Sequence, residues 1–263
     1  MAPRGTGEVM AVIWQRRVGD HRYEVRSAGR TRRLYTNGVF HSQYNPAAPV
    51  TGGVWDLLTL AAFADPASMR RALVLGVGGG AVVRQLRRFL DLEVTGVELD
   101  PVHLDVARRH FGVGPEVRLE QAEAGRWLDG YDGPPFDLVV DDLFSHEGGE
   151  PRRAVTADAG WLHRLARRLA PHGVLAVNFI SRREFRACGW HADARLRRRF
   201  PAGWTLTTPL HENVVAVFLP RPLPAEVLRR HLEAVPELDP RRRTTRLRYR
   251  LRGFAVPPEE AAS

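Results

Sequence analysis

A glycine-rich segment is the part of the sequence best suited to binding a ligand. Residues 73–80 read Leu-Val-Leu-Gly-Val-Gly-Gly-Gly, so Gly76, Gly78, Gly79 and Gly80 directly follow an apolar run. Glycines suit a turn that needs unusual backbone dihedrals and lets a ligand approach the main chain. The pattern predicts a nucleotide-binding turn between a strand and a helix.

An acid ends the next apolar run. Glu98 closes the predicted strand 94–98, where a carboxylate can accept hydrogen bonds from both hydroxyls of a ribose. Asp100 precedes Pro101 and is interpreted as the cap of the following helix rather than as a ligand contact. The turn and the acid alone do not separate NAD from S-adenosylmethionine. The order Gly-x-Gly-Gly-Gly departs from the dinucleotide pattern Gly-x-Gly-x-x-Gly and favours the adenosylmethionine type.

A second acid suits proton transfer. Asp141 follows the apolar run 136–140, and ligands of open α/β sheets gather at such strand ends. Asp141 is therefore the predicted catalytic residue, accepting a proton from an attacking group or orienting it. A carboxylate that only caps the following loop is the alternative. His146 is a further candidate base, since the pKa of histidine suits proton transfer near neutrality.

Other reactive side chains point to no separate chemistry. His103 and His110 share a predicted helix with Asp105 between them, and a solvated helix face is favoured over a zinc site. No metal site is predicted. The single cysteine, Cys188, excludes an internal disulfide and is interpreted as a partly buried thiol. Ser145 lies in no nucleophile-elbow sequence.

The elements that position these residues change character along the chain. Residues 9–45 are β-rich, and 54–63 reads as a helix. From residue 71, short apolar strands alternate with amphipathic helices, which specifies a parallel sheet covered on both faces. The predicted strands are 72–75, 94–98, 117–119, 136–140 and 173–179, and the predicted helices are 81–90, 101–110, 158–169, a stretch within 182–200, and 221–235.

The end of the sheet differs from a dehydrogenase. The strands 204–208 and 214–219 are joined by a link too short for a helical crossover, so they should pair antiparallel. We therefore expect an α/β Rossmann-like class I methyltransferase fold, with a mostly parallel seven-stranded sheet that ends in an antiparallel hairpin. The expected organisation is a small N-terminal β-rich domain at 1–50, a nucleotide-binding domain at 51–220, and a C-terminal helix with an Arg-rich, partly disordered tail at 221–263.

Composition limits the partners. The net charge is +9, and every basic residue is arginine, which indicates a codon bias rather than a selected basic patch. The exception is an arginine cluster at 241–252, which leaves a nucleic-acid-binding or non-catalytic scaffold protein open as the alternative function. No apolar run approaches the ~18 residues of a membrane span. The N-terminus lacks a signal pattern, so a cytoplasmic protein without a membrane partner is expected.

These motifs, in order from about Val25 to Leu219, resemble the spermidine synthase (polyamine aminopropyltransferase) family. That family has a small N-terminal β-domain, a Gly-x-Gly-Gly-Gly loop and a Glu-x-Asp at the end of the second strand. The resemblance implies that S-adenosylmethionine or its decarboxylated form binds at Gly76–Gly80 and Glu98. Glu123-Ala124 stands where the family has an Asp-Ala pair whose acid contacts the adenine amino group, and Asp141 stands where an acid begins the gate loop.

The departures from the family concern the amine substrate. The family motif Asp-Ser/Thr-x-Asp-Pro reads Asp141-Asp142-Leu143-Phe144-Ser145 here, so Phe144 replaces the acid that binds the polyamine. The family's Tyr-His-Glu appears as Val54-Trp55-Asp56. An expected glutamine appears as His41, although a shift of register would bring Gln43 to its place. The predicted acceptor-binding residues are thus His41, Asp56, Asp142 and Phe144.

The predicted function follows from both sets of residues. We expect a transferase that uses S-adenosylmethionine or a related adenosyl nucleoside, without a metal, and acts on a small-molecule acceptor. The acceptor is expected to be other than putrescine, because a site without carboxylates would poorly compensate the positive charges of a polyamine. Methyl and aminopropyl transfer both remain open. The resemblance also implies a homodimer formed through the N-terminal domain.

Overall fold

The structure, a computed structural model, describes residues 10–145 and 152–256. The candidate base His146 and the predicted disordered end after Pro257 lie outside these residues. Among the described residues, no helix has the length and apolar character needed to cross a membrane.

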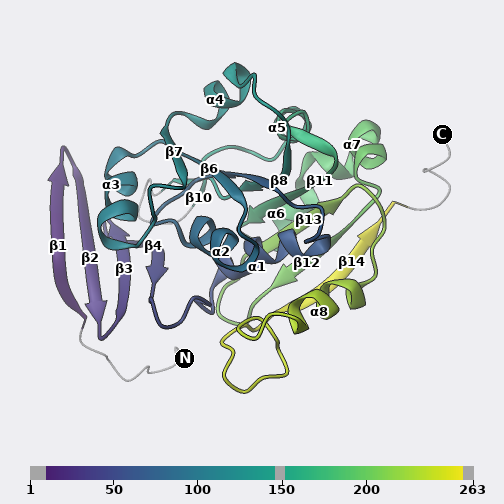
Figure 1. The fold of residues 1–263 in the computed structure, drawn as a ribbon. Helices are drawn as coiled ribbons and strands as arrows, with labels where there is room; N and C mark the ends of the chain where they lie inside the picture. The colour runs from purple at the N-terminus through teal and green to yellow at the C-terminus, as the bar shows by residue number, and fades with distance from the viewer. Residues whose placement is uncertain (1–9, 146–151, 257–263) are drawn as a thin grey trace.

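A four-stranded antiparallel sheet forms the N-terminal part, at the left of Figure 1. The tight turns at Gly19 and Gly29 have φ of +55° and +56°, which glycine adopts without strain. Residues 9–45 were predicted to be β-rich, but the last strand of this sheet was not among the predicted strands. The four strands, paired in sequence order, are β1 (Ala11–Val18), β2 (His21–Ala28), β3 (Thr31–Thr36) and β4 (Val39–Tyr44).

A larger mixed sheet forms the body of the molecule. Its order is β14-β12-β13-β11-β8-β5-β6-β7, with parallel pairing from β11 to β7 and antiparallel pairing from β11 to β14. The predicted antiparallel hairpin is therefore present. The strands are β5 (Arg71–Leu75), β6 (Glu93–Glu98), β7 (Arg118–Gln121), β8 (Phe136–Asp141), β11 (Leu169–Phe179), β12 (Ala202–Thr207), β13 (Val214–Leu219) and β14 (Arg250–Ala255).

The eighth strand corrects the expected seven-stranded sheet. β14 pairs with β12 in a segment that was predicted to belong to a partly disordered tail beyond the sheet. Its sequence, Arg-Leu-Arg-Gly-Phe-Ala, carries a glycine and two exposed arginines, so it lacks an apolar strand signal. Phe254 nevertheless packs into the core on one face of the sheet, and Leu251 into the core on the other.

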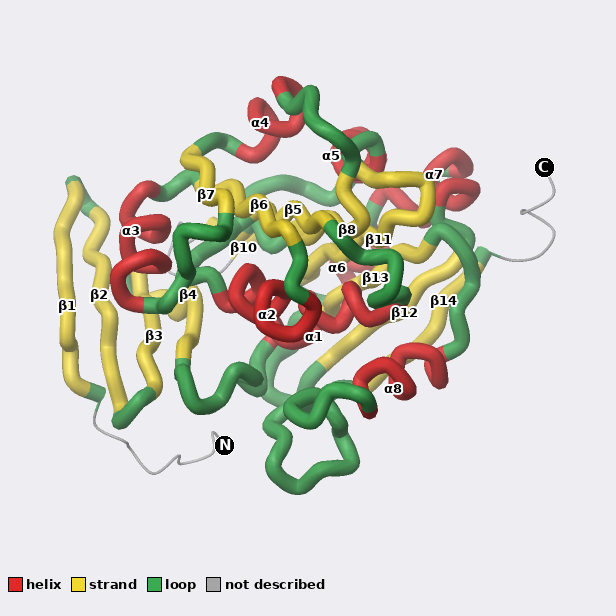
Figure 2. Tube along the Cα trace, in the orientation of Figure 1, coloured by secondary structure: helices red, strands yellow, loops and turns green. Residues whose placement is uncertain are grey.

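Helices cover both faces of the large sheet, as Figures 1 and 2 show. Side chains of successive strand residues alternate between the two faces, so each face has its own core. One core includes α1 (Val54–Leu60), the 3₁₀ turn Ala61–Ala64, α2 (Ala81–Leu90) and α8 (Ala225–Glu233). The other includes α4 (Ala124–Gly130), α5 (Ala159–Ala166), α6 (Arg182–Ala187), the 3₁₀ turn Gly189–His191 and α7 (Ala194–Arg199).

The N-terminal sheet packs on α3 (Pro101–His110). Val25 and Leu34 of the sheet and Val106 and Phe111 of the α3 segment are fully buried against one another. Gly79 lies beside this contact, since a Cβ there would stand 2.7 Å from the Ser42 side chain and 2.8 Å from that of Phe111. Close packing of the two sheets therefore requires glycine at this position.

Two helix predictions were too long and one helix was not predicted. The stretch 182–200 is interrupted where Cys188 has an extended backbone (ψ 155°) between α6 and the following 3₁₀ turn. α5 ends at Ala166 because β11 already begins at Leu169. The unpredicted helix α4 is short and has glycine at its second and last positions, which weakens the helical pattern.

Candidate active site

One cavity of about 1110 Å³ lies at the carboxyl ends of the parallel strands, beside the N-terminal sheet. Ligands of open α/β sheets bind at this edge. Loops after β5, β6, β7, β8 and β11 all contribute to the wall. Predicted site residues that line it are His41, Gly76, Gly78, Glu98, Glu123, Ala124, Asp142 and Phe144.

The glycine turn after β5 forms part of the wall. Gly76 and Gly78 line the cavity with φ of +84° and +51°, a backbone region that favours glycine. Gly79 and Gly80 do not line it, so the structure does not place them in the predicted ligand contact. Gly80 caps α2, and a Cβ there would stand 2.5 Å from Val113. These two glycines serve packing.

Glu98 lies across from the turn at the end of β6. One carboxylate oxygen accepts hydrogen bonds from the backbone N–H groups of Val77 (3.0 Å) and Gly78 (2.9 Å), and the other accepts from Asp100 (3.0 Å). Each carboxylate oxygen has two lone-pair sites, so the group keeps acceptor capacity for a further hydroxyl. Glu98 therefore braces the glycine turn and also faces the cavity.

Asp100 is the cap that the sequence indicated. Its side chain accepts a hydrogen bond from the Val102 N–H at the start of α3 (2.8 Å). Its other oxygen accepts one from the Tyr23 hydroxyl (2.7 Å), which ties β2 to this edge of the large sheet. Burial and the bond to Asp100 raise the pKa of Tyr23, so the phenol stays a donor.

Glu123 and Ala124 stand after β7, at the same edge. The Glu123 carboxylate accepts hydrogen bonds from the backbone N–H groups of Gly125 (2.8 Å) and Arg126 (2.7 Å), which makes it the N-cap of α4. Glu123 still lines the cavity, as does the exposed Leu99 after β6. Apolar and acidic groups thus flank one end of the cavity, as a nucleoside base and ribose require.

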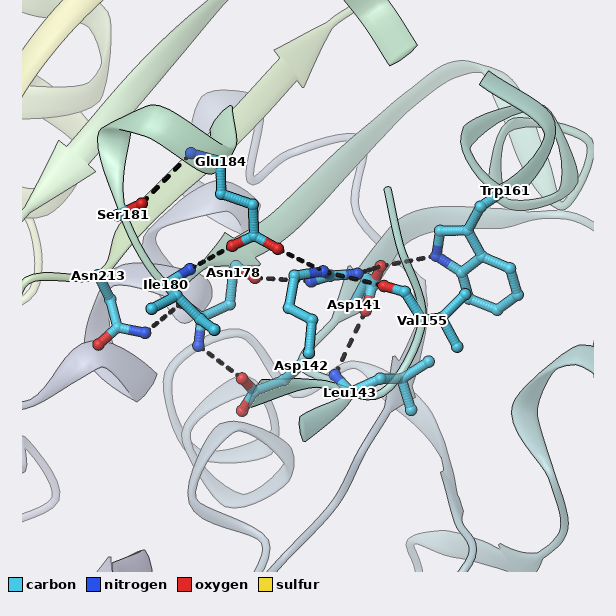
Figure 3. A network of polar contacts seen from close by, with 11 residues as sticks. Asp141, Asp142, Leu143, Val155, Trp161, Asn178, Ile180, Ser181, Glu184 and Asn213 are labelled. Carbon is cyan, nitrogen blue, oxygen red and sulfur yellow. Dashed lines mark hydrogen bonds and ion pairs between the residues drawn. The ribbon is translucent and has the colours of Figure 1, made fainter. Parts of the chain in front are cut away.

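Asp141 and Asp142 point to opposite sides of β8, and the structure places the predicted catalytic residue outside the cavity. Asp141 is fully buried, and one carboxylate oxygen accepts hydrogen bonds from Arg153 (2.7 Å) and from the Trp161 indole (2.8 Å). Figure 3 shows this carboxylate directed toward Trp161, and Asp142 below it directed away. Asp141 therefore does not face an acceptor, contrary to the prediction.

Asp142 is the acid that lines the cavity at the end of β8. Burial raises its pKa to about 7, although a hydrogen bond from the Asn178 amide (2.7 Å) favours the charged form. Asn178 ends the apolar part of β11, and its side-chain oxygen accepts a hydrogen bond from Asn213 (3.0 Å). A carboxyl with a pKa near neutrality can exchange a proton with a bound molecule at physiological pH.

Asp56 is a second predicted contact that the structure places elsewhere. Its buried carboxylate accepts hydrogen bonds from Thr51, Gly52 and Gln85 below α1, and desolvation raises its pKa. It braces the loop before α1 and does not line the cavity. The neighbouring Trp55 does line it and meets Phe40 edge to face, with ring centroids 5.3 Å apart.

Several lining residues were not singled out from the sequence. Asn178 could have been found as the polar residue near the end of an apolar strand, at the edge where ligands bind. His211 and Asn213 come from the loop between β12 and β13, whose approach to β8 no local pattern indicates. Within residues 10–145 and 152–256, no group of His, Cys, Asp and Glu side chains could hold a metal ion.

Known proteins match parts of this chain. A methyltransferase-domain family model matches residues 72–173. Polyamine aminopropyltransferase 2 of Caldanaerobacter subterraneus subsp. tengcongensis is 32% identical over 93 residues, covering 34% of this chain and 31% of that protein. Polyamine aminopropyltransferase of Corynebacterium efficiens is 33% identical over 128 residues, covering 45% and 24%. The chain thus matches about a third or less of the length of these relatives.

Solved structures share the fold over more of the chain. A probable spermidine synthase from Corynebacterium glutamicum superposes with a TM-score of 0.65 at 16% identity, covering 92% of this chain and 91% of that one. Spermidine synthase from Thermotoga maritima gives a TM-score of 0.60 at 15% identity, covering 82% and 75%. The sequence relatives and the shared fold confirm the resemblance to spermidine synthase-like proteins, and the chain has a methyltransferase-type fold.

Proposed function

We propose that this chain is a transferase that binds S-adenosylmethionine or its decarboxylated form and acts on a small amine acceptor. The observation that carries the proposal is the shared cavity, which is lined by the glycine turn, Glu98 and Asp142. The names of the sequence relatives support aminopropyl transfer, and the matching methyltransferase-domain model supports methyl transfer.

The lining residues fit an adenosyl nucleoside. Gly76 and Gly78 bring bare backbone to the cavity wall, and Glu98 retains lone pairs toward it. The apolar Leu99 is 66% exposed in this wall, and Ala124 lies nearby, so the pair offers a surface for a base. When bound, such a nucleoside supplies a carbon attached to a sulfonium, and the carbon–sulfur bond breaks with its electrons left on sulfur.

Asp142 replaces Asp141 as the proposed proton acceptor. An ammonium acceptor must lose a proton to become a nucleophile, and a carboxylate with a pKa of about 7 suits that transfer near neutrality. The Asn178 amide fixes the orientation of this carboxylate. Asp141, held by Arg153 and Trp161, has no access to the acceptor.

The acceptor end of the cavity favours one cationic centre on an apolar or aromatic body. In the described part of the chain four acids line the cavity, and Glu98, Asp100 and Glu123 stand at the ends of β6 and β7. Asp142 is the remaining one. The apolar or aromatic side chains of Phe40, Trp55, Phe144 and Ile180 also line the cavity, together with the uncharged Asn178 and Asn213. Putrescine carries two charges and would leave one of them without a partner here.

Calorimetry with S-adenosylmethionine, decarboxylated S-adenosylmethionine and methylthioadenosine tests the nucleoside half of the proposal. Binding of at least one of them, lost on substitution of Glu98, is expected. A folded protein that binds none would refute the proposed function. Asp142→Asn should keep nucleoside affinity, because the proposed nucleoside contacts are Gly76, Gly78 and Glu98. It should abolish transfer to any acceptor found.

A further inference from the structure

A buried ion pair lies directly behind the proposed proton acceptor. The Arg153 side chain is 3% exposed and that of Asp141 is 0% exposed, and their nearest atoms are 2.7 Å apart. Breaking a buried pair leaves an uncompensated charge, which is strongly destabilising. Burying a charge pair in this position costs desolvation free energy.

Arg153 contacts four elements of the site from one guanidinium. It donates hydrogen bonds to Asp141 at the end of β8, to the Asn178 carbonyl at the end of β11 (2.6 Å) and to the Val155 carbonyl (3.1 Å). Its Nε lies 3.6 Å from Glu184 of α6. Figure 3 shows Asp141, Asn178 and Glu184 in this network of contacts, with a dashed line from the Asn178 amide to Asp142.

Arg153 also fastens a short ribbon to the cavity. It belongs to β10 (Arg152–Arg153), which pairs with β9 (Phe144–Ser145). The Ala154 N–H donates to the Leu143 carbonyl (2.9 Å) beside this pair. Phe144, Ser145, Ala154 and Val155 all line the cavity, so the ion pair holds one arm of this ribbon against the strand that carries Asp142.

We propose that Arg153, paired with Asp141, is a positioning residue that sets the orientation and the ionisation of Asp142 through Asn178. The inference rests on the proposed function only for the use of Asp142 in catalysis. In this role Asp141 is a fixed buried charge beside Asp142, the proposed proton acceptor. This role differs from the catalytic role predicted for it from the sequence.

The two charges act on Asp142 in opposite directions. Asp141 raises the pKa of Asp142 and Arg153 lowers it, and Glu98 across the cavity raises it as well. The other titratable side chains that line the cavity are His21, Tyr23, His41, Asp100, His103, Glu123 and His211. Removing one member of the ion pair should therefore move the titration of Asp142 in a direction that identifies the member.

The test is a direct titration of Asp142 by ¹³C NMR on protein labelled at the aspartate side-chain carboxyl, with Asp142→Asn assigning the signal. Arg153→Met should raise the midpoint and Asp141→Asn should lower it, each by about one pH unit, or tenfold in proton concentration. The double variant Asp141→Asn with Arg153→Met leaves no unpaired buried charge and should return the midpoint toward the parent value. Arg152→Met, on the exposed neighbour in β10, should leave it unchanged.

The outcomes separate positioning from stability and from the proposed function. If a single variant fails to fold, the double variant and Arg153→Lys still report. Lys keeps the charge but lacks the guanidinium fork that contacts Asp141 with one nitrogen and the Asn178 carbonyl with another. Equal midpoints in the parent and all folded Arg153 and Asp141 variants would overturn the proposal, and so would shifts in one shared direction. The titration needs no nucleoside or acceptor, so it stands or falls separately from transferase activity.

Discussion

Carboxylates in this protein divide by what their oxygen atoms already bind. Asp56 and Asp141 are buried among donors from their own surroundings and are committed to structure. Glu98 combines backbone donors with access to the cavity, and Asp142 has one amide donor and the cavity. Access to the cavity therefore separates the proposed ligand-binding acids from the bracing acids.

Glu98→Ala should weaken binding of an adenosyl nucleoside by at least about 10-fold. One charge-assisted hydrogen bond to a ribose contributes ~1.5–3 kcal/mol, and the glycine turn also loses the acceptor that holds Val77 and Gly78. Calorimetry measures the change. Glu93→Ala, on an exposed residue of the same strand, is the matched control. Unchanged affinity in Glu98→Ala would remove Glu98 from the site.

Asp142→Asn should change how stability depends on pH. The folded-state pKa of Asp142 is raised to about 7 from 3.8, so its favourable contribution is present below pH 3.8 and is lost as the pH rises through 7. The parent should therefore lose up to about 4 kcal/mol between these limits, and Asp142→Asn should not. Urea unfolding at pH 5 and pH 8 measures the difference. Parallel pH dependence in the two proteins would show that Asp142 is ionised throughout.

At the scale of elements, the sequence predicted most of what the apolar pattern controls. The alternating units between residues 71 and 179 and the final hairpin have the predicted types, and Gly76, Gly78 and Glu98 lie at the predicted strand ends. The choice between Asp141 and Asp142 could not be made, because both faces of β8 are buried and no polar alternation reports which way a residue points.

Contacts between segments far apart in the sequence explain the remaining failed predictions. β14 pairs with β12, which lies far from it in the sequence. The sequence of β14 itself lacks an apolar strand pattern, so its place in the sheet depends on this partner. The arginine cluster that suggested a nucleic-acid partner is partly used within the fold. Arg241 contacts Glu233 and Asp239, and Arg248 donates to backbone carbonyls.

Phe254→Ala should lower the free energy of unfolding by about 2–4 kcal/mol. The ring packs with Trp190 and Phe218, at centroid distances of 4.9 and 5.7 Å, and losing it leaves a cavity at the sheet edge. Thermal or urea unfolding measures the loss. Arg252→Ala, exposed on the same strand, should change stability by less than about 0.5 kcal/mol. Equal effects of the two variants would mean that β14 adds no stability.

At the scale of the whole molecule, one cavity is shared by two sheets. The N-terminal sheet contributes His21, Tyr23 and His41 to its wall, and the large sheet contributes the glycine turn and Asp142. Buried contacts of the N-terminal sheet with α3 hold the two halves together. We therefore expect side chains from both sheets to select the proposed acceptor.

The assembled cavity should discriminate against putrescine. We expect no robust spermidine formation from putrescine and decarboxylated S-adenosylmethionine, with turnover far below the order of 1 per second that is usual for enzymes. Amines with a single charge and an aromatic or apolar body should be better acceptors, because Phe40, Trp55 and Phe144 line that part of the wall. Product formation followed by mass spectrometry checks both statements. Turnover of putrescine at ordinary enzyme rates would contradict this account of Phe144.

The position of β14 has a consequence for how the chain is made. β12 lies between β13 and β14, so both of its edges are paired in the finished sheet. During synthesis the ribosome delivers β12 and β13 first and β14 last, at roughly 5–20 residues per second. For a time on the order of seconds, β12 is an open edge that can pair with another nascent copy. Slowing translation between Thr207 and Arg250 should therefore increase aggregation of the newly made protein, without changing the finished molecule.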